Sequence, residues 1–351
     1  MAPRNILVTG GCGFIGSHFI EHTFATYPEA RVTCVDSLTY AAHPDTVAYV
    51  AALAPDRYRF VRADIGSPEV LELIGRGGFD AIVNFAAESH VDRSILDPAA
   101  FVRTNVLGLQ NLLDAARVAQ LARFVHVSTD EVYGTLEPTA PLSTEKSPLD
   151  PNSPYAASKA AADLMALAAQ RTHGIPLLIT RCTNNYGPFQ FPEKLLPLVI
   201  ANALEGKPIP IYGDGRQVRD WIYVLDHARG IDAVLRQGRV GEIYNISACE
   251  ERHNIDLVRG VLGLLGKPES LITYVGDRPA HDRRYALDAA KIRVELGWKP
   301  SVSFEEGLKR TVDWYVKNES WWKKVRDKDY FAFYQANYEK KFQGTSKESH
   351  V

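Results

Sequence analysis

The chain has 351 residues, of which 46% are hydrophobic and 23% charged, and its formal net charge is −2 at pH 7. Such a length and composition are typical of a globular protein with one large core or two unequal domains. The near-neutral charge excludes a broad basic surface, so we expect neither nucleic acid nor membrane as a partner, and an anionic ligand would need a few placed cations.

Strand-like and helix-like segments alternate through the first half of the chain. Short apolar runs rich in β-formers lie at Asn5–Thr9, Val32–Asp36, Tyr58–Arg62, Ala81–Phe85, Phe124–Ser128 and Leu177–Arg181. Helix-length segments separate or follow them at Ile15–Tyr27, Pro68–Gly75, Ala99–Ala119 and Tyr155–Thr172. Unbroken apolar strands that alternate with helices are typical of a parallel sheet covered on both faces. The sequence therefore predicts an α/β fold with a doubly wound parallel sheet.

The second half has a looser pattern. Prolines interrupt it at Pro192, Pro197, Pro208 and Pro210. We therefore predict a first domain over residues 1–188 and a smaller mixed α/β lobe over residues 189–330. The run Asp220–Leu225 and the helix that begins at Asp226 are expected to rejoin the main sheet, over residues 220–245. The polar residues 336–351 are expected to form a disordered tail.

No segment predicts export, a membrane span or a disulfide framework. No apolar run approaches the roughly 20 residues that a transmembrane helix needs. The first residues enter a strand pattern at once, which leaves no room for a signal peptide. The four cysteines, at positions 12, 34, 182 and 249, lack CxxC spacing and are expected to be reduced thiols with no bound metal. We expect a cytoplasmic protein.

A glycine-rich turn, Gly10–Gly16, follows the first strand and precedes a helix. Glycine permits the tight turn, the close approach of a pyrophosphate and the packing of helix on strand, and the helix N-terminus directs free N–H groups at the phosphates. Asp36 ends the second strand, where a carboxylate can bind an adenosine ribose and would repel a 2′-phosphate. Asp64 and Ile65 either contact the adenine or form only a strand-end turn. The unit predicts a Rossmann-type domain that binds NAD, not NADP.

Tyr155 and Lys159 are spaced one turn apart on a predicted helix. Residues i and i+4 share a helix face, so the lysine ammonium is expected beside the phenol. A neighbouring positive charge favours the phenolate and should lower the tyrosine pKa from its usual value of about 10. The phenol could then act as a base toward a sugar hydroxyl.

Together these motifs resemble the extended short-chain dehydrogenase/reductase superfamily. Its TGxxGxxG motif corresponds to Thr9–Gly16 and its YxxxK pair to Tyr155 and Lys159. In that superfamily a Ser or Thr at the position of Thr129 hydrogen-bonds the hydroxyl that is oxidised. The superfamily also contains epimerases, decarboxylases and reductases, so other residues must indicate the reaction.

Two adjacent carboxyls, Asp130 and Glu131, follow Thr129 at the end of a predicted strand. An epimerase or a simple dehydrogenase needs no second acid/base pair. Removal of water across C5 and C6 of a hexose does, because one group takes the C5 proton and another protonates the departing C6 hydroxyl. An acidic turn that caps the next segment is the structural alternative.

Over roughly residues 4–320 the chain resembles the dTDP-glucose 4,6-dehydratase family. The resembling stretches are Phe85–Ser94, Ser128–Gly134, Asn152–Lys159, Arg181–Pro188, Pro192–Leu195, Gly213–Trp221 and Asp277–Tyr285. Three departures from the family pattern stand out. Cys12 replaces the usual Ala, Ala280 replaces a usual Gly, and after Tyr40 the chain has Ala41-Ala42-His43-Pro44 where the family tends toward Ala-Gly-Asn.

The resemblance implies site residues. It makes Asp130 the acid at C6, Glu131 the base at C5 and Tyr155 the base at the C4 hydroxyl, assisted by Thr129 and Lys159. The implied NAD-binding residues are Gly10, Gly13, Phe14, Ile15, Gly16, Asp36, Ser37, Leu38, Thr39, Asp64, Ile65, Phe85, Ala86, Ala87, Thr104, Tyr155, Lys159 and Asn185. The implied substrate-binding residues are Ser89, Thr129, Asn184, Lys194, Leu195, Pro210, Tyr212, Arg219, Asn254, Arg278 and His281.

The chemistry that follows is an internal redox cycle that converts dTDP-glucose to dTDP-4-keto-6-deoxyglucose. Oxidation at C4 acidifies the C5 proton, elimination of water follows, and the hydride returns to C6. The sequence does not decide whether the substrate carries a thymidine or a uridine nucleotide. The alternatives are another NAD-dependent sugar-nucleotide dehydratase of the superfamily, a 4-epimerase, or a non-catalytic NAD-sensing protein. The intact acid pair tells against an epimerase and against GDP-mannose-type dehydratases, which usually lack the Asp.

Two predicted helices carry apolar or small residues on more than one face. They are Ala99–Ala119 and Tyr155–Thr172. The parent sheet can cover one side only, so the remainder predicts a further helical partner. We expect a homodimer with a four-helix contact, as superfamily relatives also imply, while burial by the chain's own second lobe is the alternative.

Overall fold

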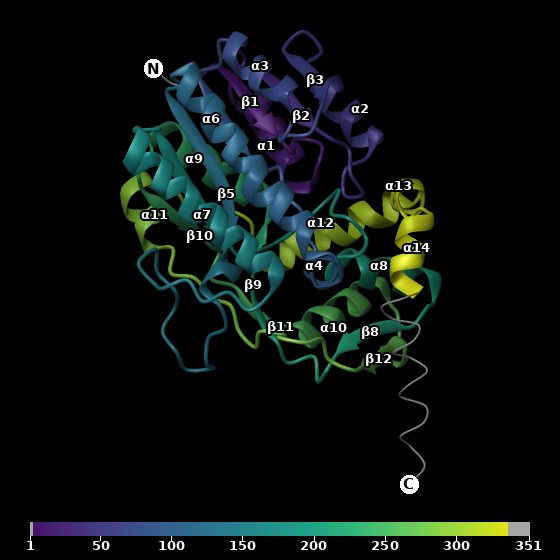
Figure 1. The fold of residues 1–351 in the computed structure, drawn as a ribbon. Coiled ribbons are helices and arrows are strands. Elements are labelled where there is room, and N and C mark those ends of the chain that lie inside the picture. The colour runs from purple at the N-terminus through teal and green to yellow at the C-terminus, as the bar shows by residue number, and fades with distance from the viewer. Residues whose placement is uncertain (1–2, 336–351) are drawn as a thin grey trace.

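The computed structural model describes residues 3–335 (Figure 1). The predicted tail, 336–351, lies outside the described residues. The larger sheet has seven parallel strands in the order β10-β6-β5-β4-β1-β2-β3. They are β1 (Asn5–Thr9), β2 (Arg31–Asp36), β3 (Tyr58–Arg62), β4 (Ala81–Asn84), β5 (Arg123–Thr129), β6 (Leu177–Cys182) and β10 (Ile243–Ile246). The strand order reverses at β1 and β4, which is the Rossmann arrangement, so the predicted fold class is confirmed.

Helices cover both faces of this sheet. On one face lie α3 (Pro68–Arg76), α6 (Leu109–Ala119) and α7 (Pro154–His173), and on the other lie α1 (Phe14–Thr26), α9 (Val224–Gln237) and α11 (Ala290–Leu296). Successive strand residues point to opposite faces. Ile6 and Val8 therefore pack with the α1 and α9 side, whereas Leu7 packs with the α6 and α7 side. This alternation buries β1 from Ile6 to Thr9, so the glycine turn follows directly from a buried strand.

The segment between β4 and β5 differs from the prediction. The expected single helix over Ala99–Ala119 consists of α5 (Pro98–Phe101), the π-helical segment η1 (Val102–Gly108) and α6, with α4 (Val91–Leu96) before them. Such π segments occur frequently at functional sites, because the extra residue redirects side chains. Gly108 lies against Ile65, where a Cβ would come within 2.8 Å of the Ile65 Cδ1. A regular helical periodicity gives no signal for this change.

The second half of the chain forms most of the smaller lobe, at the bottom of Figure 1. Its strands form a three-stranded sheet, β11-β9-β7, and a two-stranded sheet, β12-β8. They are β7 (Asn184–Tyr186), β8 (Ile209–Tyr212), β9 (Val218–Tyr223), β11 (Glu251–His253) and β12 (Ile272–Val275). Its helices are α8 (Leu195–Glu205), α10 (Asn254–Leu265), α12 (Phe304–Lys317), α13 (Glu319–Val325) and α14 (Lys328–Tyr334). The remaining short elements are α2 (Pro44–Leu53) and the 3₁₀ turns η2 (Asp130–Tyr133) and η3 (Glu269–Leu271).

The run Asp220–Leu225 does not pair with the main sheet as expected. Its strand, β9, pairs with β7 and β11 instead. The free edge of β6 is occupied by β10, with Ile243 opposite Ile179, and α9 packs on the sheet between the two lobes. The chain therefore returns to the main sheet through α9 and β10. Within residues 3–335, no helix combines the length and apolar character needed to cross a membrane.

Candidate active site

A cavity of about 300 Å³ lies at the carboxyl ends of the main-sheet strands, where Rossmann folds bind ligands. It is continuous from the glycine turn to the start of α8. Of the residues predicted from the sequence, the cavity is lined by Gly10, Gly13, Phe14, Ile15, Gly16, Asp36, Ser37, Thr39, Asp64, Ile65, Phe85, Ala86, Ala87, Ser89, Thr104, Thr129, Asp130, Glu131, Tyr155, Lys159, Asn184, Asn185 and Lys194. Leu38 and the predicted substrate residues beyond Lys194 are outside its lining.

The glycine turn brings backbone close to the strand beside it. Gly10 has a φ of +67°, and a Cβ there would come within 2.6 Å of the Ala86 backbone nitrogen. A side chain is therefore excluded at this position on both conformational and steric grounds. Helix α1 begins at Phe14, directly after the turn, and its N-terminus faces the cavity. The arrangement leaves N–H groups and a positive dipole end for a pyrophosphate.

Asp36 fixes the shape of the loop that follows β2. Its Oδ2 accepts from the Cys12 N–H at 3.0 Å and its Oδ1 accepts from the Leu38 N–H at 2.8 Å. Leu38 adopts a φ of +55°, and its side chain packs against the core instead of the cavity. Asp64 lines the cavity, and its Oδ1 accepts from the Gly66 N–H at 2.7 Å, so it also forms the strand-end turn considered as the alternative.

Thr129, Asp130 and Glu131 lie where β5 passes into η2. The Thr129 hydroxyl donates to the Asp130 Oδ1 at 3.2 Å, and the Asp130 Oδ2 is buried with no hydrogen-bond partner among the described residues. Burial, then the charges of Glu131 and Asp220, raise the pKa of Asp130 well above its usual range. Burial also raises the pKa of Glu131, but the charges of Arg278, Lys194 and Arg219 oppose that rise. Of the two, Asp130 is therefore the one favoured as a proton donor, and Glu131 is favoured as a base.

Tyr155 and Lys159 lie on the first turns of α7, where Ser153 caps the helix by accepting from the Ala156 N–H. The expected lowering of the tyrosine pKa is not what the structure shows. Burial, followed by the charge of Glu131, raises the pKa of Tyr155 well above its usual value. The Lys159 ammonium donates to the Val127 carbonyl at 2.7 Å, and burial lowers its own pKa to about 8. For the Tyr155 phenol, desolvation by burial therefore outweighs the effect expected from the neighbouring lysine.

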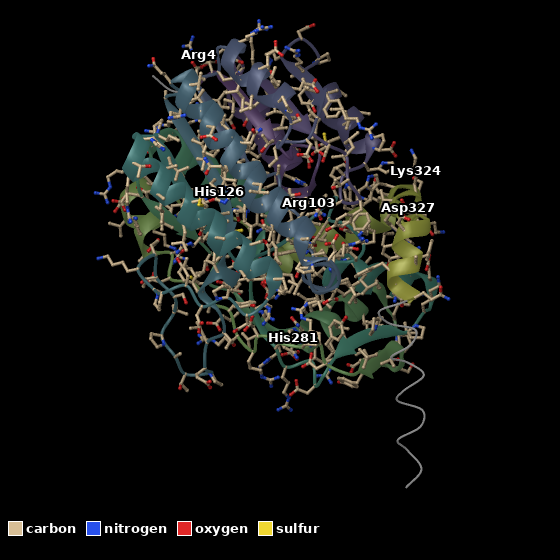
Figure 2. All side chains as sticks on the ribbon, in the orientation of Figure 1. Arg4, Arg103, His126, His281, Lys324 and Asp327 are labelled. Carbon is tan, nitrogen blue, oxygen red and sulfur yellow. The ribbon has the colours of Figure 1, made fainter. Side chains whose placement is uncertain are left out.

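A second group of polar residues lies in the smaller lobe, beyond Glu131. Asp92 accepts from the Tyr212 hydroxyl at 3.0 Å and from the Arg278 guanidinium at 3.2 Å. The His281 ring lies edge-on to the Tyr212 ring, with 5.9 Å between centroids, and Figure 2 marks His281 in this lobe. The remaining predicted substrate residues are Leu195 at the start of α8, Pro210 in β8, Arg219 in β9 and Asn254 at the start of α10.

Arg219 is a buried cation that forms no close ion pair with the described residues. Its guanidinium donates to the carbonyls of Val218 and Asp282 and lies over the Tyr285 ring. Arg219 is only 5% exposed, and among the described residues no carboxylate oxygen lies within 4.0 Å of its guanidinium. The charges of Glu131 and Asp130 act on this guanidinium, but its burial without a close ion pair is costly unless a ligand completes it. This position therefore favours an anion.

Comparison with known proteins gives consistent results. The family model described as GDP-mannose 4,6 dehydratase matches residues 7–311. The dTDP-glucose 4,6-dehydratase of Xanthomonas campestris pv. campestris (strain B100) is 51% identical over 343 residues, covering 92% of this chain and 96% of the relative. The chain belongs to the dTDP-glucose 4,6-dehydratase family.

Solved structures of that family have the same fold. The dTDP-glucose 4,6-dehydratase of Streptomyces venezuelae, solved with NAD and TYD bound, is 51% identical with a TM-score of 0.87, covering 92% of this chain and 99% of that one. The dTDP-glucose 4,6-dehydratase of Bacillus anthracis, solved with NAD, is 46% identical with a TM-score of 0.85, covering 92% and 99% of the two chains. The resemblance inferred from the motifs is confirmed.

Several residues of the site were missed by the sequence reasoning. The cavity is also lined by Val35, Tyr40, Ala41, Ala42, Ala63, Glu88, Val127, Ser128, Cys182, Thr183, Gln190, Phe191 and Glu193. Asp92 lies outside the lining but holds both Tyr212 and Arg278. Its place inside the family stretch Phe85–Ser94, between His90 and Arg93, was the available signal. Glu193 pairs with Arg93 at 2.9 Å, and that long-range contact leaves no local pattern.

Two departures from the family pattern have structural consequences. Ala280 has a φ of +51°, the left-handed region in which glycine is free of strain. An L-residue there costs about 1–2 kcal/mol, which explains the usual glycine of the family. The other departure, after Ala42, places Pro44 at the first position of α2, and His43 caps that helix by accepting from the Asp45 N–H. Residues 43 and 44 therefore form the N-terminus of α2.

The Asp36 carboxylate should set the choice of cofactor. We expect the apo-protein to bind NAD at least about tenfold more tightly than NADP, a difference of about 1.4 kcal/mol, because a 2′-phosphate would face this carboxylate. Asp36→Ala should reduce this difference between the affinities for NAD and NADP. Arg62 lies opposite Asp36 in the β2–β3 pairing, whereas Arg31 lies at the far end of β2, so Arg62 is the better phosphate partner. Titration calorimetry with both nucleotides tests this, and equal affinities for the wild type would contradict it.

Proposed function

We propose that this chain converts dTDP-glucose to dTDP-4-keto-6-deoxyglucose by oxidation at C4, elimination of water across C5 and C6, and return of the hydride to C6. The observation that carries the proposal is the presence of Asp130 and Glu131 in the same cavity as Tyr155 and the glycine turn. Oxidation alone would use Tyr155 and the cofactor end. The second acid/base pair has a use only when water is also removed.

The cofactor end of the cavity fits NAD. The Gly10 turn admits a pyrophosphate, the N-terminus of α1 faces it, and Asp36 is placed for the adenosine ribose. We assign the predicted cofactor residues to this role, with Leu38 acting through its backbone. NAD, when bound, supplies the hydride acceptor and donor. The partly buried Tyr155 and the buried Lys159 line the same cavity.

The protein side chains move the protons. Tyr155 removes the proton of the C4 hydroxyl, which Thr129 helps to position. Once C4 is a ketone, the C5 proton is acidic and Glu131 removes it. Asp130, whose pKa is raised by burial and by two carboxylates, stays protonated and donates to the C6 hydroxyl as that group leaves. Each residue therefore acts in the protonation state that its surroundings favour, except Tyr155, which must first lose its proton.

The smaller lobe should hold the nucleotide diphosphate. Arg219 and Arg278 provide guanidinium groups suited to phosphate oxygens, and Tyr212 offers a ring beside them for the base. Their influence on the pKa of Glu131 indicates that this cation group adjoins the acid pair. A sugar attached to that diphosphate would consequently extend from the lobe into the cavity, toward Asp130 and Tyr155.

Incubation with sugar nucleotides tests the function. The purified protein with NAD should form from dTDP-glucose a product with the alkali-induced absorbance of a 4-keto sugar. UDP-glucose, under matched conditions, should react more slowly. Release of dTDP-galactose without a 4-keto product would instead indicate the 4-epimerase alternative, and no reaction with any nucleotide hexose would leave only the non-catalytic alternative.

We also propose a cytoplasmic homodimer. The described cysteines are all free, which suits a reducing compartment. Helices α4 and α7 and the segment η1 pack side by side, and large apolar side chains on them are exposed: Leu96 by 67%, Leu107 by 60% and Leu164 by 58%. Exposed apolar side chains on three packed helical segments favour a partner, and a second copy would pair these helices about a two-fold axis.

Light scattering at micromolar concentration tests the dimer. The wild type should have about twice the 39.0 kDa of one chain. The double variant Leu107→Glu/Leu164→Glu should be monomeric, because two charges would be buried in the contact. Val294→Glu is the matched control, since Val294 is 83% exposed on α11 at the other face of the sheet. A wild-type monomer with full activity would contradict the proposal.

A further inference from the structure

A buried charged network lies behind the catalytic helix and is not used by the mechanism above. Asp163, on α7, is fully buried and accepts from the Arg181 Nε at 2.8 Å through its Oδ2. Arg181, also buried, donates to the Tyr133 hydroxyl at 2.8 Å, and that hydroxyl donates to Asn245 at 2.9 Å. Replacing a buried ion pair by apolar residues is often neutral or stabilising, so stability alone does not account for such a pair.

The second oxygen of this carboxylate has no hydrogen-bond partner among the described residues. The Asp163 Oδ1 lies 3.7 Å from the His126 Nε2, and Figure 2 marks His126 where α7 covers the sheet. The Asn84 Oδ1 accepts from Thr9, so its amide nitrogen must be the donor to the His126 Nδ1 at 3.1 Å. The neutral ring then carries its proton on Nε2, directed at Asp163. Burial lowers the pKa of His126 well below its usual value, so the ring brings no charge.

The same carboxylate lies one helical turn beyond Lys159. Residues i and i+4 share a helix face, and both side chains reach β5 at neighbouring positions: Lys159 at the Val127 carbonyl and Asp163 at the His126 ring. Lys159 is only 3% exposed, so its ammonium has lost most of its hydration. Asp163 is the charge that most favours the ammonium form, whereas burial raises the pKa of the nearby Cys182 thiol and keeps that thiol neutral.

We propose that Asp163 is a positioning residue for the reaction, holding the Lys159 ammonium charged beside Tyr155 while Arg181 holds the carboxylate in place and the neutral His126 ring lies beside it. The proposal rests on the function assigned above to Tyr155 and Lys159. Without the Asp163 charge, a buried lysine loses its proton at lower pH, and a neutral amine no longer favours the tyrosinate. Asp163 itself does not line the cavity, so its removal should affect kcat and leave KM for the sugar nucleotide nearly unchanged.

The pH dependence of kcat for the NAD-bound enzyme tests this role. Asp163→Asn should match the wild type at about pH 6 and fall about tenfold below it near pH 9, since one unit in the pKa of Lys159 is a factor of ten. The sign follows from the lysine: its ammonium form is lost as pH rises through its pKa, and that pKa is lower in the variant. Asp163→Glu should restore the wild-type profile in large part.

Tyr133→Phe is the matched control, because it removes the Arg181 contact without changing any charge. Tyr133→Phe should lower the melting temperature, but the ratio of its kcat to that of the wild type should not change with pH. If Asp163→Asn does not fold, Asp163→Asn/Arg181→Gln removes both charges together and should show the same pH-dependent loss. If the ratio of kcat between the folded Asp163 variant and the wild type does not change with pH, the proposal is overturned. An inactive wild type would instead overturn the proposed function.

Discussion

Asp130→Asn and Glu131→Gln should each lower kcat about 10²–10⁴-fold, the range typical for a lost general acid or base. Neither residue is needed to remove the C4 hydrogen. Both variants should therefore still oxidise dTDP-glucose and then stop, so that the absorbance of reduced, enzyme-bound cofactor accumulates in single-turnover mixing. The two carboxyls lie in the cavity next to Thr129, and the structure gives them different surroundings, with one opposing cation for Asp130 and three for Glu131.

Glu137→Gln is the control for this pair. Glu137 is an exposed carboxylate that follows η2 and lies outside the cavity lining, so its variant should turn over like the wild type. If Asp130→Asn or Glu131→Gln fails to reduce the cofactor at all, the division of roles is wrong. The carboxyl concerned would then act in the oxidation step or in binding.

Tyr155→Phe should lower kcat by a similar factor, but it should differ from the two carboxyl variants in whether reduced cofactor accumulates. The variant lacks the hydroxyl that takes the C4 proton, so oxidation should stop and no reduced cofactor should form. Burial raises the pKa of Tyr155, which makes this proton transfer the step most sensitive to the surroundings of the phenol. Stopped-flow absorbance with dTDP-glucose measures it, and Tyr274→Phe, at a residue 47% exposed in β12, is the control. Accumulation of reduced cofactor in Tyr155→Phe would assign the C4 base elsewhere.

Local signals predicted the parts of the site that depend on local geometry. The turn at Gly10, the carboxylate that ends β2 and the Tyr155–Lys159 spacing each follow from a short stretch of sequence, and the structure places all of them on one cavity. Strands β1 and β3 have the predicted limits, because their apolar runs are bounded by turn residues.

Contacts between residues far apart in the sequence determine the features that the sequence analysis missed or predicted wrongly. β9 reads as a main-sheet strand, but β10 occupies the available edge of β6. The pKa of Tyr155 follows its burial, which no i+4 spacing encodes. Helix α14 packs Phe333 against His90, and Arg93 lies over the same ring, although this part of the chain carries no motif. In each case the outcome depends on partners far away in sequence.

The fate of the C4 hydrogen tests the central claim most directly. dTDP-glucose labelled with deuterium at C4 should give a 4-keto-6-deoxy product with the deuterium at C6 of the same molecule, and in heavy water the product should gain one solvent deuterium at C5. Mass spectrometry and NMR of the product measure both positions. Transfer within one molecule is the predicted result, because the reduced cofactor stays bound while Glu131 and Asp130 remove water. Loss of the label to solvent, or its recovery at C4 in an epimerised sugar, would contradict the account.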